Sequence, residues 1–300
     1  MDEFQLRIPV ALMIFNRPDT TREVFEAVRA ARPPRLYLVS DAAREGRPEE
    51  EAKVREARSY VETHIDWPCA LHKNYAERNM GCKRRMATGI TWVFSQEEIA
   101  IILEDDCVPK PEFFRFEQEM LLRYKENENV FLVSGTNNLP GFPIEGDYTF
   151  SRFASIWGWG SYARAWRFYD VEMKRWERMR GERRVKKLFS FPEYLLFQRD
   201  ADRTGAGLVD TWDMQWLLTV IDRGFGVVPA GNLIRNIGCG REDATHTKDT
   251  SREISAYGEM RFPLRHTEQT TINEAYDRAY CRTYYGAKRF WNACLRAIGR

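Results

Sequence analysis

A buried strand that runs directly into three consecutive acids constrains the fold of this chain more than any other feature. The five residues from Ile99 to Leu103 are apolar and mostly β-branched, and Glu104, Asp105 and Asp106 follow them without a spacer. A continuous apolar run of this length is typical of a strand that is buried on both faces of a parallel sheet. The pattern therefore predicts three carboxylates at the carboxyl end of a central strand.

Three adjacent carboxylates at the end of a buried strand require a partner. Like charges that lose hydration repel one another, so such a group usually faces a cation or several hydrogen-bond donors. Mg²⁺ and Mn²⁺ are typically held by one or two carboxylates, with water and phosphate oxygens completing the shell. The triplet predicts a divalent metal site. In the plainer interpretation, Asp105 or Asp106 only caps the helix that begins at Pro111.

Apolar runs of strand length alternate with amphipathic stretches along the first half of the chain. Strands are expected at 10–15, 36–39, 70–72 and 130–133, and helices at 48–62, 83–96 and after a capping box formed by Thr20 and Glu23. This alternation predicts a largely parallel sheet with helices on both faces. Ligands of such sheets bind beyond the carboxyl ends of the strands, so Asn16, Arg17, Asp41 and the acid triplet are expected to face one crevice.

Composition and missing motifs exclude several classes of protein. No Gly-x-Gly-x-x-Gly follows the first strand and no Gly-x-x-x-x-Gly-Lys-Ser/Thr occurs, which argues against a dinucleotide-binding fold and a P-loop enzyme. A net charge of +2 gives no electrostatic reason to expect nucleic acid as a partner. The six cysteines show no metal-ligand spacing and are expected to be reduced thiols. With no secretory or membrane-spanning apolar segment, the protein is expected in the cytoplasm.

The composition changes between Thr136 and Trp166, where Gly, Pro, Asn and aromatic residues predominate. Trp157 and Trp159, separated by one glycine, could form a wall on which a sugar ring stacks; they could equally be core residues at a tight bend. The basic stretch from Arg164 to Lys187 is expected to form one or two surface helices, and a polyanionic acceptor is the alternative for it.

Three features of the last third are candidates for function. Asp213 lies in the first turn of a helix expected from Thr211 to Arg223, where an acid can simply complement the helix dipole. His246 lies in a polar loop. The aromatic and basic segment 274–300 is expected to be a helical tail that packs on the chain or forms a dimer contact, with an anionic membrane surface as a second possibility.

Taken together, these residues resemble the GT-A-fold, nucleotide-sugar-dependent glycosyltransferases. The acid triplet followed by Pro-x-x-Phe-Phe is similar to the group that contains the Golgi N-acetylglucosaminyltransferase that starts complex N-glycan branching and its bacterial relatives. Bacterial members from polysaccharide gene clusters are similar in the segments 157–159, 211–213 and 236–247. The resemblance extends from about Val10 to Thr247, and the tail lies outside it.

The resemblance implies roles for particular residues. Asp106 would bind a metal ion, Mn²⁺ or Mg²⁺, that bridges the two phosphates, and His246 would close on the metal or diphosphate. Asp213 would be the general base. The implied nucleotide-sugar contacts are Glu104 and Asp105 at the ribose and the metal's water shell, Asp41 at a uracil N3, and Asn16, Arg17 and Arg78 around the base and phosphates. Trp157, Trp159 and Trp212 would line the sugar or acceptor.

The implied architecture is a single GT-A-type α/β unit: residues 1–135 form the nucleotide-sugar half, 136–250 the acceptor and catalytic half, and 251–300 the helical tail. The implied activity is inverting, metal-dependent transfer from a UDP-sugar to a hydroxyl of a glycan or lipid-linked acceptor. Two alternatives remain. A sugar nucleotidylyltransferase would require a Gly-rich basic loop after the first strand, which Asn16 to Asp19 lacks. A non-catalytic carbohydrate-binding protein would have no need of the acids, Asp213 and His246 together. The sugar, the acceptor and the oligomeric state are left open.

Overall fold

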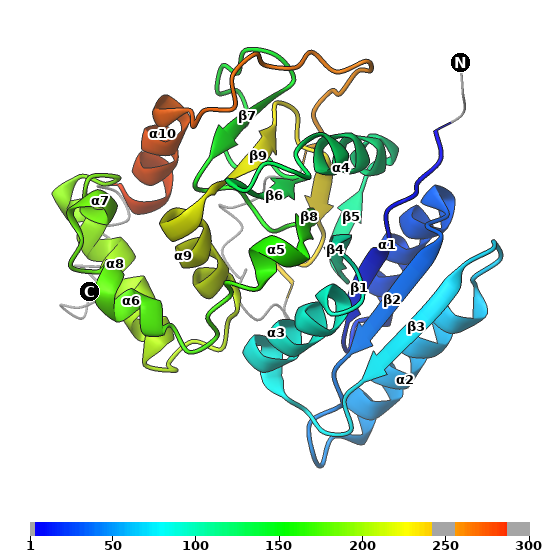
Figure 1. Cartoon of the computed structure of the whole chain (residues 1–300). Helices are drawn as coiled ribbons and strands as arrows, with labels where there is room; N and C mark the ends of the chain where they lie inside the picture. Colours follow the sequence, from blue (N-terminus) through cyan, green and yellow to red (C-terminus); the bar gives the residue numbers. More distant parts are fainter. Residues whose placement is uncertain (1–3, 242–255, 287–300) are drawn as a thin grey trace.

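The apolar runs of the sequence form the strands of one eight-stranded sheet (Figure 1). The computed structural model describes residues 4–241 and 256–286. The strand order is β3-β2-β1-β4-β8-β6-β9-β7. These strands are β1 Val10–Ile14, β2 Arg35–Ser40, β3 Ala70–Tyr75, β4 Ile99–Glu104, β6 Val130–Ser134, β7 Tyr148–Ser151, β8 Trp159–Tyr162 and β9 Phe225–Pro229. Only β7 and β8 run antiparallel to their neighbours. The predicted α/β class with a largely parallel sheet is confirmed.

Helices cover both faces of this sheet. On one face α1 (Pro18–Ala31) packs against α2 (Pro48–Thr63) and α4 (Pro111–Arg123). On the other face α3 (Gly81–Phe94) contacts β1, β2 and β4 and also α5 (Ala163–Trp166). The next helix on this face, α9 (Asp213–Arg223), meets α5 where the rings of Trp166 and Trp216 lie 5.0 Å apart. The central strands are therefore buried on both sides, as their unbroken apolar runs require, while the edge strand β3 is not buried.

One local prediction was wrong. The capping box at Thr20 and Glu23 does not form, because α1 already begins at Pro18. The hydroxyl groups of Thr20 and Thr21 donate instead to the carbonyl oxygen of Arg17, at 3.3 and 2.7 Å. Proline is pre-organised for the first helical position, and its fixed φ places the start of the helix ahead of the threonines.

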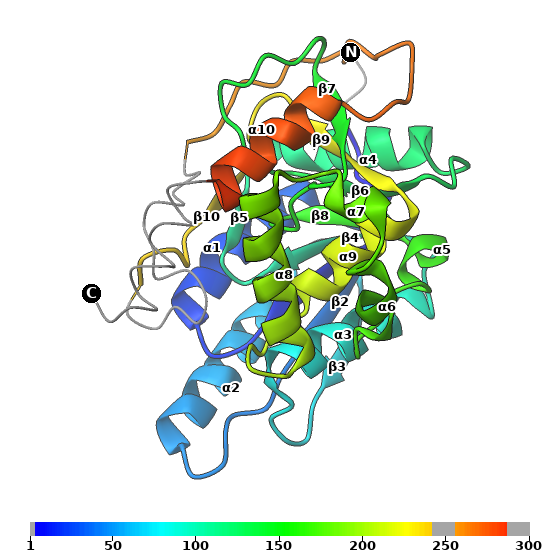
Figure 2. The same cartoon turned by 90° about the vertical axis from the view of Figure 1, so that its left-hand side faces the viewer.

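A second helical layer lies beside the sheet, at the left of Figure 1 and facing the viewer in Figure 2. It contains α6 (Lys174–Met179), α7 (Arg183–Lys186), α8 (Phe191–Gly205) and α10 (Glu274–Tyr285). These helices share an apolar cluster that includes Trp176, Phe189, Phe197 and Cys281. The expected surface helices of the basic stretch are thus present. Of the expected tail, 274–285 is helical and 287–300 lies outside the described residues.

A small antiparallel sheet joins the two halves of the chain beside the acid triplet. Its strands are β5 (Cys107–Pro109) and β10 (Ile234–Asn236), and Asn236 pairs with Cys107. Because β5 directly follows the acids, this pairing carries the later half of the chain to them. No helix in the described ranges is long and apolar enough to cross a bilayer.

One carboxyl group on α4 is buried without a hydrogen-bond partner among the described residues. Glu117 on α4 is fully buried, and neither of its carboxyl oxygens has a hydrogen-bond partner among the described residues. Gly160 on β8 makes room for it, since a Cβ atom there would lie 2.6 Å from Glu117 Oε2. Burial raises the pKa of Glu117 well above its usual value.

Replacing this group should stabilise the protein at neutral pH. The folded-state pKa of Glu117 is raised, so folding takes up a proton and stability falls as the pH rises above the unfolded-state value, about 4.5. Glu117→Met removes both unpaired oxygens, and we expect it to raise the free energy of unfolding by about 1–3 kcal/mol at pH 8. The gain should shrink towards pH 4. Urea unfolding at both pH values tests this, with Glu119→Gln on the same helix as the control; equal gains at both values would contradict it.

Candidate active site

The acid triplet stands at the carboxyl end of β4, between the ends of the neighbouring strands. Glu104 is the last residue of β4 and pairs with Met13 of β1. Asp105 turns back towards β1, where its Oδ2 accepts a hydrogen bond from the backbone N–H of Phe15 at 3.1 Å. Asp106 Oδ2 accepts one from the guanidinium of Arg17 at 3.2 Å. The end of β1 thus supplies the first donors to these acids, and Arg17, which was expected to contact the base and phosphates, pairs with Asp106.

The charges of the triplet are not balanced by this arrangement. Burial raises the pKa of all three carboxyl groups, and the charge of Asp106 raises the pKa of Glu104 and Asp105 further. The positive charge of Arg17 lowers the pKa of each of the three groups. A further cation would relieve the repulsion, because an opposite charge within about 4–6 Å favours the ionised form.

The donor set suits a hard divalent ion. Carboxylate oxygens are the ligands that Mg²⁺ and Mn²⁺ prefer, and such ions keep waters and phosphate oxygens in their shell. Among the described residues no three His, Cys, Asp or Glu side chains form a complete ligand set. His246, the other expected ligand, lies outside the described residues. The residues present therefore fit an ion that is held by Asp106 and completed by ligands from the substrate.

Asp41 follows β2 and organises the loop ahead of α3. It is 5% exposed, and its carboxylate accepts hydrogen bonds from the backbone N–H groups of Ala42, Met80 and Gly81 and from the Asn79 side chain, at 2.9 to 3.2 Å. Burial raises the pKa of Asp41, although the N–H donors oppose the shift. The carboxylate of Asp41 is therefore already hydrogen-bonded to protein donors. A nucleotide base that contacts it would share the carboxylate with them.

A second carboxylate, which was not predicted from the sequence, completes the start of α3. The oxygens of Asp210 accept hydrogen bonds from the backbone N–H groups of Cys82 and Lys83, at 2.9 and 3.0 Å. Gly81 has φ +75 in this turn, and a Cβ atom there would lie 2.8 Å from Asp210 Oδ2. Asp210 thus caps a helix from a distant part of the chain and fixes the segment that leads to Asp213.

Removing the Asp210 carboxylate should destabilise the start of α3 and the segment that contains Asp210. A helix cap contributes about 1 kcal/mol, so we expect Asp210→Ala to lower the free energy of unfolding by about that amount. Asp210→Asn should lose less, because its amide oxygen still accepts one hydrogen bond. Urea unfolding of the two variants beside the wild type measures the difference. An Asn variant as unstable as the Ala variant would show that the caps do not act through the acceptor oxygens.

Asp213 lies near the triplet although more than a hundred residues separate them. It is the first residue of α9 and is exposed, and its Oδ1 accepts hydrogen bonds from Thr211 Oγ1 at 2.5 Å and from the Met214 N–H at 2.6 Å. Its charge is among the causes that raise the pKa of Glu104. Both hydrogen bonds from described residues go to Oδ1, which leaves Oδ2 available to an incoming hydroxyl group.

The side chain of Cys82 marks the point where these acids meet. The charges of Glu104, Asp210, Asp213 and Asp41 all raise the pKa of its thiol, after burial. The charges of four carboxylates from three segments of the chain therefore act on one half-buried side chain at the carboxyl edge of the sheet. Of these four acids, Asp41, Glu104 and Asp213 were candidates from the sequence, whereas Asp210 was not.

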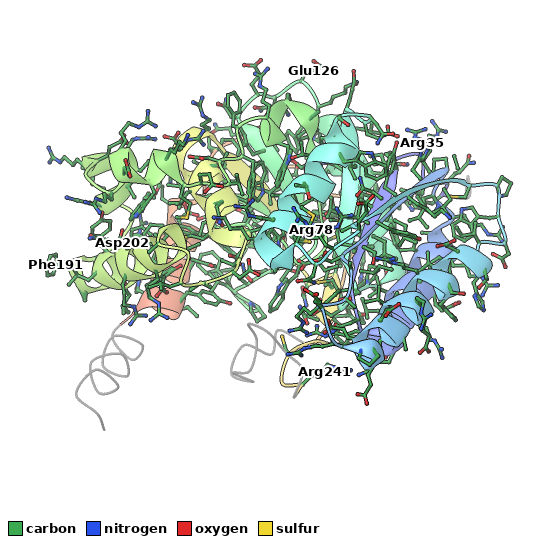
Figure 3. All side chains as sticks on the ribbon, turned by 90° about the horizontal axis from the view of Figure 1, so that it is seen from below. Arg35, Arg78, Glu126, Phe191, Asp202 and Arg241 are labelled. Carbon is green, nitrogen blue, oxygen red and sulfur yellow. The ribbon has the colours of Figure 1, made fainter. Side chains whose placement is uncertain are left out.

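The small sheet brings the segment before His246 to the metal-binding candidate. The N–H of Ile237 donates to the carbonyl oxygen of Asp106 at 2.8 Å. Gly238 follows, and a Cβ atom there would lie 2.1 Å from Asp106 Oδ2, so only glycine fits this close approach. Arg241, labelled in Figure 3, pairs with Asp19 at 2.7 Å. The described chain therefore passes beside Asp106 at Gly238, shortly before His246 in the sequence.

Two of the three predicted stacking tryptophans are core residues. Trp159 and Trp212 are 0% and 2% exposed, and their rings stack on each other with centroids 5.8 Å apart. A ring buried in this way has no face for a sugar, so the prediction was wrong for these two. Trp157 is half-buried and packs at the edge of the core. It remains a candidate for the sugar wall.

The remaining nucleotide candidates lie around the end of β3 and the loop after β1. Arg78 is exposed, is labelled in Figure 3, and lines a pocket of about 560 Å³ with Asn79, Met80 and Arg84 among others. Asn16 Nδ2 donates to Glu50 Oε1 at 2.9 Å. Asn16 thus binds Glu50 at the end of the loop that follows Asp41. Arg78 lines a pocket together with Asn79 and Met80, which both donate hydrogen bonds to Asp41.

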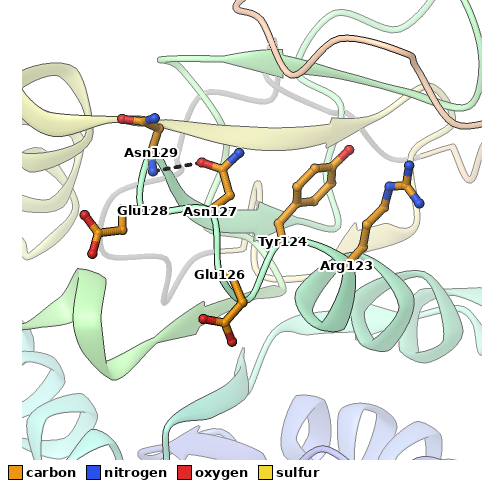
Figure 4. A pocket seen from close by; sticks show the side chains of 6 residues that line it. All are labelled: Arg123, Tyr124, Glu126, Asn127, Glu128 and Asn129. Carbon is orange, nitrogen blue, oxygen red and sulfur yellow. Dashed lines mark hydrogen bonds between the residues drawn. The ribbon is translucent and has the colours of Figure 1, made fainter.

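A second pocket lies apart from these acids (Figure 4). It has a volume of about 700 Å³ and is lined by Arg123, Tyr124 and residues 126–129, where the Asn129 N–H donates to Asn127 Oδ1 at 3.0 Å. This turn precedes β6 and therefore lies at the amino end of a strand, whereas the acids follow the carboxyl ends. The pocket is not part of the candidate active site.

Comparisons with known proteins add fold neighbours only. No protein-family model matches the chain, and no curated protein sequence matches it. Among solved structures, a UDP-glucose pyrophosphorylase complexed with UDP-glucose matches at 11% identity and TM-score 0.26, over 47% of this chain and 66% of its own. The inositol-1-phosphate CTP transferase from T. maritima matches at 10% identity and TM-score 0.33, over 56% and 76%. An apo UDP-glucose pyrophosphorylase matches at 10% identity and TM-score 0.36, over 74% and 90%. The chain is similar to parts of these α/β enzymes, and the likeness does not extend to a shared family.

Proposed function

We propose that this protein is an inverting glycosyltransferase that moves a sugar from a nucleoside diphosphate donor, a UDP-sugar, to a hydroxyl group of a glycan or lipid-linked acceptor. The observation that supports this most is that the charges of Asp41, Glu104 and Asp213 all act on Cys82, with Asp105 and Asp106 directly after Glu104 at the end of β4. The acids at the strand ends are suited to binding a nucleotide and a metal ion. The separate, exposed Asp213 suits a proton acceptor.

Each residue contributes one part of the reaction. Asp106, with Arg17 beside it, faces the diphosphate, and a divalent ion bound there supplies Lewis-acid neutralisation of the leaving group. Asp213 accepts the proton of the acceptor hydroxyl. The acceptor oxygen then forms its bond to the anomeric carbon while the bond from that carbon to the diphosphate oxygen breaks. Attack from the face opposite the leaving group inverts the anomeric configuration.

The exposure of Asp213 favours transfer over nucleotidyl exchange. Nucleotidyl exchange joins two phosphate-bearing substrates and takes no proton from a sugar hydroxyl, so it needs no general base at this place. Asp213 is held through Oδ1 by two donors and is solvent-accessible. A general base requires this arrangement, because it must be fixed in position yet reach the substrate.

A donor screen tests the proposal. UDP-, GDP- and dTDP-sugars are incubated with Mn²⁺, and the released nucleoside diphosphate is measured with and without candidate glycan acceptors. We expect one donor to be hydrolysed slowly and the release to rise with the acceptor. In parallel, each nucleoside triphosphate is supplied with a sugar 1-phosphate. Release of pyrophosphate in that arm, without diphosphate release in the first, would replace the proposal by a nucleotidylyltransferase. No release in either arm, together with no metal-dependent affinity for UDP in titration calorimetry, would favour a carbohydrate-binding protein.

A further inference from the structure

An exposed corner of the second helical layer combines cationic and apolar side chains. We call Arg183, Lys186, Lys187, Phe191 and Leu195 the α7–α8 corner. The three cationic side chains are exposed, and no described carboxylate forms an ion pair with them. Phe191 is 76% exposed and Leu195, one turn further along α8, is 40% exposed. Large apolar side chains seldom stand so far in water beside a charge cluster without a partner.

The position of this corner makes it accessible. Figure 2 shows α7 and α8 on the face towards the viewer, and Figure 3 shows Phe191 at the outer end of the molecule, far from Arg35. The surrounding chain is basic as well: the stretch from Lys174 to Arg203 contains ten Lys and Arg residues against five Asp and Glu residues. Asp222 balances part of this charge, since Arg175 and Arg178 pair with it at 3.3 Å. The corner itself keeps its positive charge.

The segment that follows α10 does not complement this charge. Tyr285 near the end of α10 packs edge-on against Phe189 and Phe197, with centroids 5.8 and 5.6 Å apart, so the chain leaves beside the start of α8. Residues 287–300 contain four Lys and Arg residues and no Asp or Glu residue. Two segments of the same sign cannot neutralise each other. Residues 287–300 therefore do not supply the negative charge that the corner attracts.

We infer that the α7–α8 corner docks on the surface of an anionic lipid bilayer. A bilayer interface takes both kinds of side chain, because its headgroups attract Lys and Arg while aromatic and aliphatic residues enter the acyl boundary. A soluble polyanion would use the charges but would leave Phe191 in water. The docking does not depend on the proposed function, although it would place the site near a lipid-linked acceptor.

The geometry connects this surface to the acids. Helix α8 has 15 residues and is therefore about 22 Å long. Phe191 is at its first turn, and Asp210 follows its last turn by five residues. The helix therefore leads from the docking corner to the segment that caps α3 and ends at Asp213. An acceptor anchored in the membrane could extend along this length towards the acids.

Vesicle co-sedimentation of the full chain tests the inference. The probes are phosphatidylcholine vesicles with and without phosphatidylglycerol, and soluble polyphosphate is the competing polyanion. We expect binding to the phosphatidylglycerol vesicles only. One basic residue near an anionic surface contributes roughly 1 kcal/mol, so Lys186→Ala with Lys187→Ala should weaken binding about 30-fold. Phe191→Ser should weaken it at least about tenfold, because the buried ring is lost.

Matched variants keep the result interpretable. Lys53→Ala on α2 and Leu122→Ser on α4, which is 53% exposed, remove the same kinds of group elsewhere and should leave binding unchanged. Thermal unfolding confirms that each variant is folded. The inference is overturned if the wild type does not bind the vesicles or if the corner variants bind as the wild type does. It is also overturned if Phe191→Ser has no effect while polyphosphate displaces the protein fully, since the partner is then a soluble polyanion.

Discussion

Asp213→Asn should lower the rate of sugar transfer by about 10²- to 10⁴-fold, the usual contribution of a general base. Asparagine keeps the shape of the side chain and can still accept the hydrogen bonds that Thr211 and Met214 give to Oδ1. It cannot take up a proton from the acceptor hydroxyl. Because Asp213 is exposed at the start of α9, the substitution should leave the fold intact.

The informative measurement separates transfer from donor binding. Titration calorimetry with UDP and Mn²⁺ should give the same affinity for Asp213→Asn as for the wild type, while the transfer assay shows the loss. Asp66→Asn is a matched control: Asp66 is exposed and pairs with Arg29 at 2.5 Å ahead of β3, at the other edge of the sheet. Retained transfer by Asp213→Asn would exclude the proton-acceptor role. Loss of nucleotide binding would instead assign Asp213 to the donor site.

The strand ends were predictable because a strand buried on both faces is a continuous apolar run. The run from Ile99 to Leu103 shows both the strand and the point where the acids must leave it. The same logic placed Asp41 after β2 and Arg17 after β1. Parallel neighbours end at one edge, so the convergence of these residues follows from local patterns alone.

The hydrogen bonds of Asp41 and Asp210 could not be predicted in the same way. Both carboxylates cap the start of α3 from other segments, and no pattern near Asp41 or Asp210 indicates their N–H partners. The one local sign was Gly81, whose positive φ permits the close approach of Asp210. A contact that depends on tertiary packing can be recognised in the sequence only at the small residue that makes room for it, here Gly81.

The tryptophans were misjudged because the backbone between them is not a regular strand. Residues two apart share a face in an extended strand, and the sequence left open whether Trp157 and Trp159 form a wall for a sugar ring or lie in the core at a tight bend. Gly158 has φ +58, and a Cβ atom there would lie 2.3 Å from Ile234 Cδ1. This left-handed turn breaks the alternation and sends Trp159 into the core, while Trp157 stays half-buried.

Asp106→Ala should lower metal-dependent nucleotide affinity by at least about 100-fold. Loss of a residue that only supports a metal ligand typically costs 10- to 100-fold in affinity, so loss of a direct ligand should reach or exceed the upper value. The effect on stability should be small. The variant loses an ion pair with Arg17 whose side chains are only 14% and 17% exposed, and it gains relief of the repulsion that raises the pKa of Glu104 and Asp105, so the two changes oppose each other.

This pairing of a large binding loss with a small stability change distinguishes a ligand from a structural residue. Titration calorimetry with UDP is carried out with Mn²⁺ and again with a chelator, and we expect the wild type with chelator to behave as Asp106→Ala does with Mn²⁺. Asp147→Ala is the control, because Asp147 also pairs with an arginine, Arg265, at 3.2 Å but lies before β7. If Asp106→Ala bound UDP and Mn²⁺ as the wild type does, the acid triplet would be a structural cap, and the metal would have to be held elsewhere.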